Sequence, residues 1–384
     1  MNKKPQLCDL YFGRNLISII IILALLDKEK NQNKKILYIS KSKSKNYSNH
    51  LNKTFLKIIH NFLNQYFDEI HYVNYSRLIK KKGRLGTVLE RSKSIKSNEK
   101  NIKLELGKNF KVSNIYAGGD DFENLLLNKI NNFPKFHLVE HGYGPLRDFI
   151  FYKVKLKDRL FCYFIKILYN LKLISYYPIE YSSYVGTLTK KINYDKFVNC
   201  KLISKNKNIT LNSILNKIFV YLKNKKKMKK RKYRYILFNY SSIIISKDKS
   251  KFNKLLKNIS LLIDKDKECV LIKGHPNYTS NKTEKFIKAL TFFFKKNKIK
   301  YMMINNDHFL KILPSQVLIK LLKIKKIISD LSTVPFHMSD DTSLKCYIPL
   351  DYAIENVSRI MYKSRDLNFK KFFFKIGKNI TFLK

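Results

Sequence analysis

Short apolar runs and helix-like stretches alternate along this 384-residue chain in two separate blocks. In the first block, five apolar runs predict strands at 7–12, 36–40, 69–73, 114–117 and 137–140. Strands that alternate with helices in this way are typical of a parallel sheet with helices on both faces. The first block is therefore expected to form a doubly wound, Rossmann-like α/β domain.

A strongly basic tract at 223–232 separates the blocks, and we expect it to be solvated because it has no apolar face to bury. After this tract the alternation resumes, with predicted strands at 235–239, 269–273, 300–304, 326–329 and 344–348. The length of the chain suits two domains. We predict one α/β domain over residues 1–228 and a second over residues 229–384.

Two segments of the first block differ in composition from the alternating strands and helices around them. Lys3 and Lys4 precede the apolar run 16–26, an arrangement that resembles a signal peptide. The run is shorter than the roughly 20 residues that span a bilayer, and no small-residue cleavage site follows it. We therefore predict a buried helix of the first βα unit. Residues 80–103 are polar and basic, which favours an exposed loop.

The formal net charge is +50, from 78 Lys and Arg against 28 Asp and Glu. Lys, Asn and Ile are enriched throughout, as an AT-rich genome would produce, so the charge alone does not indicate nucleic-acid binding. A basic nucleic-acid-binding protein stays an alternative, although no recognised motif of that class is present. Five scattered cysteines lack the spacing of a zinc site or a disulfide scaffold. This favours a reducing, cytoplasmic compartment and no bound metal.

Three polar clusters each follow a predicted strand, which is where parallel α/β sheets bind ligands. In the first cluster, Glu140-His141-Gly142, a carboxylate leaves a buried strand beside a glycine turn that a ligand can approach closely. Glu140 in these apolar surroundings is suited to act as a general base toward a hydroxyl. A helix-capping glutamate before an ordinary glycine turn would produce the same pattern.

The second cluster is Lys273-Gly274-His275-Pro276, in which the proline fixes the backbone that presents the histidine. Imidazole and ammonium groups are both good donors to phosphate oxygens. The third cluster ends in Ser332-Thr333, shortly before Pro335, where a helix N-terminus would offer free N–H groups to a phosphate. The simpler interpretations are a surface histidine before a turn and an ordinary Ser/Thr helix cap.

Together, Glu140-His141-Gly142, His275-Pro276 and Ser332-Thr333 resemble, in order and spacing, the signature of bacterial sialyltransferases. The group meant here comprises the lipooligosaccharide sialyltransferases and the capsule polysialyltransferases. These enzymes share a motif of two acidic residues and a glycine, an HP motif and an SS/ST motif. His141 departs from that pattern, because this position is acidic in the group.

The resemblance implies a GT-B glycosyltransferase architecture, in which two Rossmann-like domains face each other across a cleft. The N-terminal domain would hold the acceptor side and the base, and the C-terminal domain the nucleotide sugar. The implied reaction is an inverting, metal-independent transfer of sialic acid, or a related nonulosonic acid, from a CMP-activated donor to a hydroxyl of a surface glycan or glycolipid. No further cofactor is implied.

The resemblance also assigns roles to particular residues. Glu140 would take the proton of the acceptor, and His141 and His275 would complete the catalytic centre. The residues implied to bind the donor are Gly142, Lys273, His275, Pro276, Ser332 and Thr333.

Two related alternatives remain open. The stretch from His141 to Arg147, with the later HP and Ser-Thr motifs, is also similar to the CDP-glycerol glycerophosphotransferases of teichoic acid synthesis, which use a histidine in place of Glu140. A CMP-Kdo transferase is the other alternative.

Acceptors of such enzymes lie at the inner membrane. The basic, amphipathic segment 151–174 and the tail 369–375 have the composition of segments that lie on anionic lipid. Ordinary packing between the domains would also account for 151–174. We expect a cytoplasmic protein that is peripheral on the cytoplasmic face of the inner membrane and has no specific nucleic-acid partner.

Overall fold

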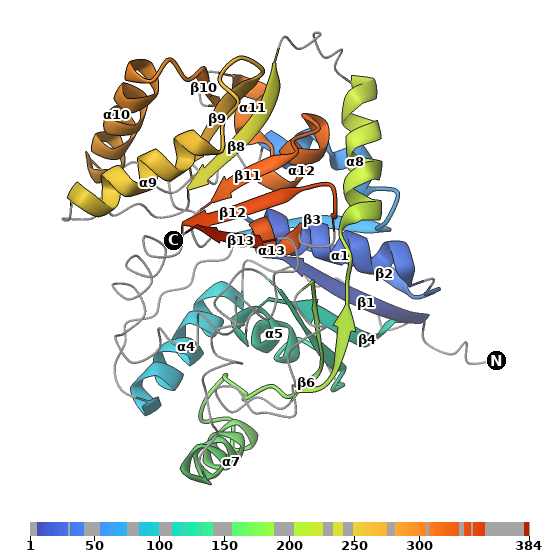
Figure 1. The fold of residues 1–384 in the computed structure, drawn as a ribbon. Helices are drawn as coiled ribbons and strands as arrows, with labels where there is room; N and C mark the ends of the chain where they lie inside the picture. The colour runs from blue at the N-terminus through green and yellow to red at the C-terminus, as the bar shows by residue number, and fades with distance from the viewer. Residues whose placement is uncertain are drawn as a thin grey trace. The chain divides into compact units, whose positions relative to one another are not determined.

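The computed structural model describes residues 6–29, 31–41, 54–74, 84–99, 110–118, 120–130, 132–140, 156–187, 203–225, 233–240, 249–274, 281–304, 307–329, 334–338, 341–349 and 380–383. The chain forms two compact units, one made of residues 1–45 and 60–210 and the other of residues 46–59 and 211–384. Each unit contains one parallel sheet with helices packed on it (Figure 1). The predicted fold class, two Rossmann-like α/β domains, is confirmed.

The first unit holds a seven-stranded sheet in the order β3-β2-β1-β4-β5-β6-β7, and neighbouring strands are parallel. The strand order reverses between β1 and β4, which makes this the switch point of the sheet. Its elements are β1 (Gln6–Gly13), α1 (Leu16–Lys28), β2 (Lys34–Lys41), α3 (His60–Leu63), β3 (Glu69–Asn74), α4 (Arg84–Asn98), β4 (Phe110–Ala117), α5 (Asp120–Leu127), β5 (Lys135–Val139), α7 (Leu156–Asn170), β6 (Tyr181–Gly186) and β7 (Ile203–Asn208).

The apolar run 16–26 forms the helix α1, as predicted. Asn15 caps it: its side chain accepts a hydrogen bond from the Ser18 N–H at 2.9 Å, and the Ser18 hydroxyl accepts one from the Asn15 N–H at 3.1 Å. Residues 18–25 are all buried, as expected for a helix that is apolar on every side. On the opposite face of the sheet, Phe12 of β1 stacks on Phe122 of α5 with ring centroids 3.7 Å apart.

The second unit holds a six-stranded parallel sheet in the order β10-β9-β8-β11-β12-β13, with its switch point between β8 and β11. Helices α9 and α10 cover one face through a core that includes Phe238, Ile259 and Phe286 (Figure 1). The elements of this unit are α8 (Asn212–Lys225), β8 (Arg234–Tyr240), α9 (Lys249–Leu261), β9 (Glu268–Gly274), α10 (Asn281–Lys296), β10 (Tyr301–Met303), α11 (His308–Ile312), α12 (Ser315–Leu321), β11 (Lys326–Ser329), α13 (Val334–His337), β12 (Lys345–Pro349) and β13 (Ile380–Leu383).

The compact units divide the chain at a different place from the predicted boundary at 228. Helix α8 packs against α12 and therefore belongs to the second unit, so the division falls after Thr210. Residues 46–59 also belong to the second unit, although they precede most of the first. The basic tract that suggested the boundary begins within the last turn of α8, at Lys223.

The exposed loop predicted for residues 80–103 is wrong over 84–98, which form the helix α4. Val88 and Ile95 are buried, and so are Ser92, Ser94 and Asn98. The Ser92 hydroxyl accepts a hydrogen bond from the Ser175 N–H at 2.7 Å. Because α4 buries small polar side chains next to few apolar ones, its sequence shows no apolar periodicity.

A buried polar network crosses four strands of the first sheet. Asp9 of β1 is fully buried and accepts a hydrogen bond from the Asn114 amide at 2.7 Å. The other end of the Asn114 amide lies 3.0 Å from His137 Nε2, and His137 Nδ1 lies 2.7 Å from the Ser183 hydroxyl. Burial, together with the charges of nearby lysines, lowers the pKa of His137 to about 3. The network therefore contains a neutral imidazole.

We expect acid to destabilise the first unit through His137. Its pKa in the folded protein lies below the ordinary value of 6.5, so the unfolded chain binds a proton that the folded chain excludes. The free energy of unfolding therefore decreases as the pH falls from 6.5 toward 3, by about 2 kcal/mol between pH 6.5 and 5. Urea unfolding should show this loss in the wild type and much less of it in His137→Gln. An equal pH dependence in the two proteins would contradict this role of His137.

Candidate active site

Glu140 directly follows β5 in the first unit and is fully buried. Its backbone N–H donates to the Val185 carbonyl at 2.9 Å, which extends the pairing of β5 with β6. Its carboxylate Oε2 accepts a hydrogen bond from the backbone N–H of Thr187 at 2.8 Å, and the Thr187 hydroxyl lies 3.4 Å from the same oxygen. These contacts fix the orientation of the carboxylate at the carboxyl end of the sheet.

Gly186, the last residue of β6, provides the space that the carboxylate occupies. A methyl group at this position would overlap Glu140 Oε2 and the ring of Tyr184. Neither Gly186 nor Thr187 was a candidate from the sequence, because only the pairing of β5 with β6 brings them to Glu140. We regard both as positioning residues for the carboxylate.

In the second unit, three polar side chains form a row across the carboxyl ends of β9, β8 and β11. The strand register pairs Asn239 with Lys273 on one side and with Ser329 on the other. Side chains of paired residues in parallel strands lie on the same face of the sheet. All three residues are at most 8 % exposed. Asn239 and Ser329 lie on the two strands of the switch point, where doubly wound sheets bind their ligands.

The end of α11 and the start of α12 contact this polar row. Lys273 Nζ donates to the Lys311 carbonyl at 3.3 Å, and the Ser315 hydroxyl donates to Asn239 Oδ1 at 2.9 Å. Burial lowers the pKa of Lys273 to about 8. Within the part of the chain that the structure describes, Ser329 Oγ makes no hydrogen bond and no carboxylate pairs with Lys273. A buried amine and hydroxyl with unused donors are suited to an anionic ligand.

Six residues proposed from the sequence lie outside the described residues: His141, Gly142, His275, Pro276, Ser332 and Thr333. The described residues end immediately before two of these groups, since Glu140 precedes His141 and Gly274 precedes His275, and they end at Ser329 before the third. The placement of these side chains stays a prediction, and so does the arrangement of the two units about a cleft.

A cavity of about 520 Å³ lies at the opposite end of the strands of the second sheet from the polar row. It is lined by residues at the amino ends of the strands, among them Arg234, Glu268 and Lys326. Lys326 donates to the Glu268 carboxylate at 2.9 Å. None of the predicted site residues lines this cavity. Among the described residues, no group of three His, Cys, Asp or Glu side chains is arranged to hold a metal ion.

No family model matches the chain, and no curated protein matches it either. The solved structures similar to it include a sialyltransferase from Photobacterium damsela, at 10 % identity and a TM-score of 0.45, covering 99 % of this chain and 82 % of the other. They also include an α/β-galactoside α-2,3-sialyltransferase from Photobacterium phosphoreum, at 13 % identity and a TM-score of 0.42, covering 99 % of both chains.

A third similar structure is the wall teichoic acid polymerase TagF, at 9 % identity and a TM-score of 0.40, covering 97 % of this chain and 85 % of the other. At such values, the substrates of these proteins do not transfer to this chain.

Proposed function

We propose that the protein is an inverting, metal-independent glycosyltransferase. It would move sialic acid, or a related nonulosonic acid, from a CMP-activated donor to a hydroxyl of a surface glycan or glycolipid. The observation that carries the proposal is the buried row of Lys273, Asn239 and Ser329 at the switch point of the second sheet. Its cation and hydroxyl are suited to the phosphate of a nucleotide. In the sequence, the His275-Pro276 motif follows β9 and the Ser332-Thr333 motif follows β11.

In the proposed mechanism, Glu140 is the general base. The acceptor hydroxyl passes its proton to the Glu140 carboxylate while its oxygen forms a bond to the anomeric carbon of the donor sugar. The bond from that carbon to the phosphate oxygen breaks on the opposite side, so the anomeric configuration inverts and CMP leaves with the electron pair. The Thr187 N–H holds the carboxylate in one orientation for this transfer.

The second unit would stabilise the leaving group. Negative charge grows on the phosphate as the bond breaks, and donors that are already in place stabilise it most effectively. Lys273 and Ser329 would supply two of these donors from the ends of β9 and β11, and His275, Ser332 and Thr333 would supply the others. Asn239 and Ser329 thus extend the set that was inferred from the sequence.

The proposal is tested by nucleotide binding and donor turnover. We expect CMP to raise the melting temperature, because a ligand at a hundred times its Kd stabilises the folded state by about 2.7 kcal/mol. We expect the protein to release CMP from CMP-sialic acid in the presence of an acceptor glycan. CMP-Kdo and CDP-glycerol are the competing donors in the same assay, and UMP is the control nucleotide.

The outcomes separate the alternatives. Turnover of CDP-glycerol alone would indicate the glycerophosphotransferase, and turnover of CMP-Kdo alone the Kdo transferase. A protein that is stabilised by an oligonucleotide but not by CMP would contradict the proposal and favour the nucleic-acid-binding alternative.

A further inference from the structure

Helix α7, which lies between β5 and β6 in the chain, has two apolar faces. The inner face holds the helix to the first unit: Ile165 is buried, and the Tyr169 ring packs edge-on against Tyr177 with centroids 5.1 Å apart. The outer face presents large apolar side chains at spacings of three and four residues, and each is 40–72 % exposed. This outer stripe consists of Leu156, Leu160, Tyr163, Phe164 and Ile167, and Leu171 continues it directly after the helix.

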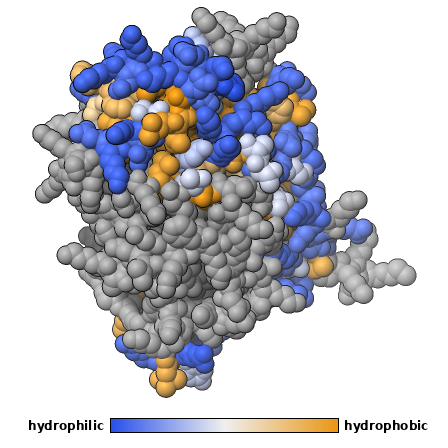
Figure 2. Space-filling view, in the orientation of Figure 1, coloured by the Kyte–Doolittle hydropathy of each residue, from blue (hydrophilic) through white to orange (hydrophobic). Residues whose placement is uncertain are grey.

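The outer stripe of α7 is longer than any other set of exposed apolar side chains on one helix among the described residues; α4, for example, exposes only Leu85 and Leu89. Single exposed side chains such as Leu261 and Phe292 in the second unit are common on protein surfaces. A contiguous stripe along one helix marks a surface that binds a partner. Figure 2 shows hydrophobic side chains next to hydrophilic ones at the lower end of the view, where Figure 1 places α7.

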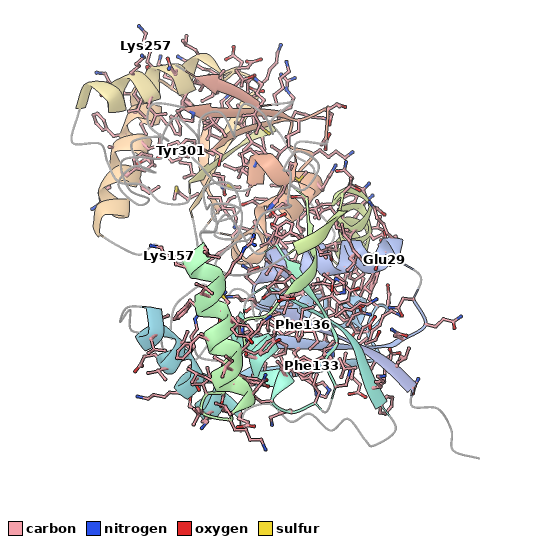
Figure 3. All side chains as sticks on the ribbon, turned by 90° about the horizontal axis from the view of Figure 1, so that it is seen from below. Glu29, Phe133, Phe136, Lys157, Lys257 and Tyr301 are labelled. Carbon is pink, nitrogen blue, oxygen red and sulfur yellow. The ribbon has the colours of Figure 1, made fainter. Side chains whose placement is uncertain are left out.

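Basic residues border the outer stripe on both sides. Successive residues of an α-helix are rotated by about 100° around its axis. This rotation places Lys157 next to Phe164 on one side of the stripe. It places Arg159 and Lys166 next to Tyr163 on the other side. Lys157 and Arg159 are exposed, whereas Lys166 forms an ion pair with Glu180 at 2.5 Å. Figure 3 labels Lys157 at the N-terminal end of the helix. An apolar stripe between two basic borders is the pattern of helices that lie in a membrane interface.

We propose that α7 lies along an anionic phospholipid surface, with its outer stripe at the boundary between headgroups and acyl chains and with Lys157 and Arg159 at the headgroups. A second copy of this chain is a poor partner for the stripe, because both copies would bring the same basic borders and a net charge of +50 to the contact. The proposal narrows the membrane segment 151–174 to one face of α7; the tail 369–375 lies outside the described residues.

No helix among the described residues is long and apolar enough to cross a bilayer. The proposed contact is one with the membrane surface, and it does not depend on the proposed glycosyl transfer. Vesicle binding is measured without a donor or an acceptor, so the two proposals can fail separately.

The chain contains no tryptophan, which allows a direct test of insertion. Tyr163→Trp places a single tryptophan, which can be excited apart from the tyrosines, in the middle of the outer stripe. We expect vesicles of phosphatidylglycerol and phosphatidylcholine to shift its emission to shorter wavelength, and brominated acyl chains to quench it. Phe292→Trp, on the exposed face of α10, is the matched control and should show neither change. Equal responses from the two probes, or none from either, would overturn the proposal.

Cosedimentation with the same vesicles tests the stripe itself. The double variant Leu160→Ser, Ile167→Ser should bind at least about tenfold more weakly than the wild type, because less apolar area enters the interface. The control variant Leu261→Ser, Phe292→Ser should bind as the wild type does. If the α7 variant keeps its vesicle binding, the stripe is not the lipid contact.

The basic borders are tested by Lys157→Gln and Arg159→Gln, each of which should weaken binding about fivefold. Lys254→Gln and Lys257→Gln on α9 are the matched controls, and high salt should weaken the binding of the wild type. A protein that is dimeric without vesicles, and whose dimer the α7 substitutions dissociate, would show that a second copy covers the stripe and would overturn the lipid assignment.

Discussion

Replacement of Glu140 by Gln is expected to lower turnover by about a thousandfold while leaving the affinity for CMP unchanged. The amide has the shape of the carboxylate and still accepts the hydrogen bond from the Thr187 N–H, so the site keeps its structure. It cannot accept the proton of the acceptor hydroxyl at neutral pH. The rate of CMP release and the calorimetric Kd for CMP measure the two effects independently.

Two further variants separate the base from its surroundings. Gly186→Ala displaces the carboxylate without removing it, since the added methyl group overlaps Glu140 Oε2. We expect it to lower kcat and to alter the pH profile. Thr187→Val keeps the backbone N–H and is the matched control with a small effect. If Glu140→Gln stays active and His141→Ala does not, the base assignment is wrong and the glycerophosphotransferase alternative gains support.

The second large effect is expected for Lys273→Met, which should abolish CMP binding and at the same time stabilise the protein. Burial lowers the pKa of Lys273 from the ordinary 10.5 to about 8, which costs about 3 kcal/mol of stability at neutral pH. Methionine fills a similar volume without a charge. We expect the melting temperature to rise by about 5–10 °C. Buried charged groups with strongly shifted pKa values are found most often at functional sites, where they bind a ligand although they destabilise the fold.

The pH dependence gives a second measurement for Lys273. The pKa of Lys273 is lowered in the folded protein, so the free-energy cost of burying its charge disappears as the pH rises from 8 toward 10.5. The difference in stability between Lys273→Met and the wild type should therefore shrink over that range. CMP binding should change in the opposite direction, since only the protonated amine attracts phosphate, and the affinity of the wild type should fall above pH 8. If Lys273→Met is less stable than the wild type and still binds CMP, the role of Lys273 is structural, through its hydrogen bond to the Lys311 carbonyl.

The fold class was predictable because most strands of both sheets are continuous apolar runs. β9, for example, is buried along nearly its whole length, so a short run of Val, Leu and Ile marks it. β7 was missed because it lies at the edge of the first sheet and consists mostly of Lys, Asn and Ser. β6 was missed because tyrosines and serines fill its buried positions.

The candidate site was predictable only where a polar residue ends an apolar run. Glu140 and Lys273 meet this condition, and the structure buries both at strand ends. Asn239 and Ser329 acquire their place from the register between β8, β9 and β11, which no local pattern of residues specifies. Gly186 likewise matters only because β6 pairs with β5.

The second unit is assembled from two stretches of the polypeptide, 46–59 and 211–384. Phe55 and Ile59 of the early stretch are buried, and the Tyr221 hydroxyl of α8 donates to the Ile58 carbonyl at 3.2 Å. During synthesis on the ribosome, the early stretch emerges long before its partners, so this half stays incomplete until the C-terminal strands have been made. A gene cut after Thr210 would therefore yield a C-terminal fragment that lacks part of its own interior.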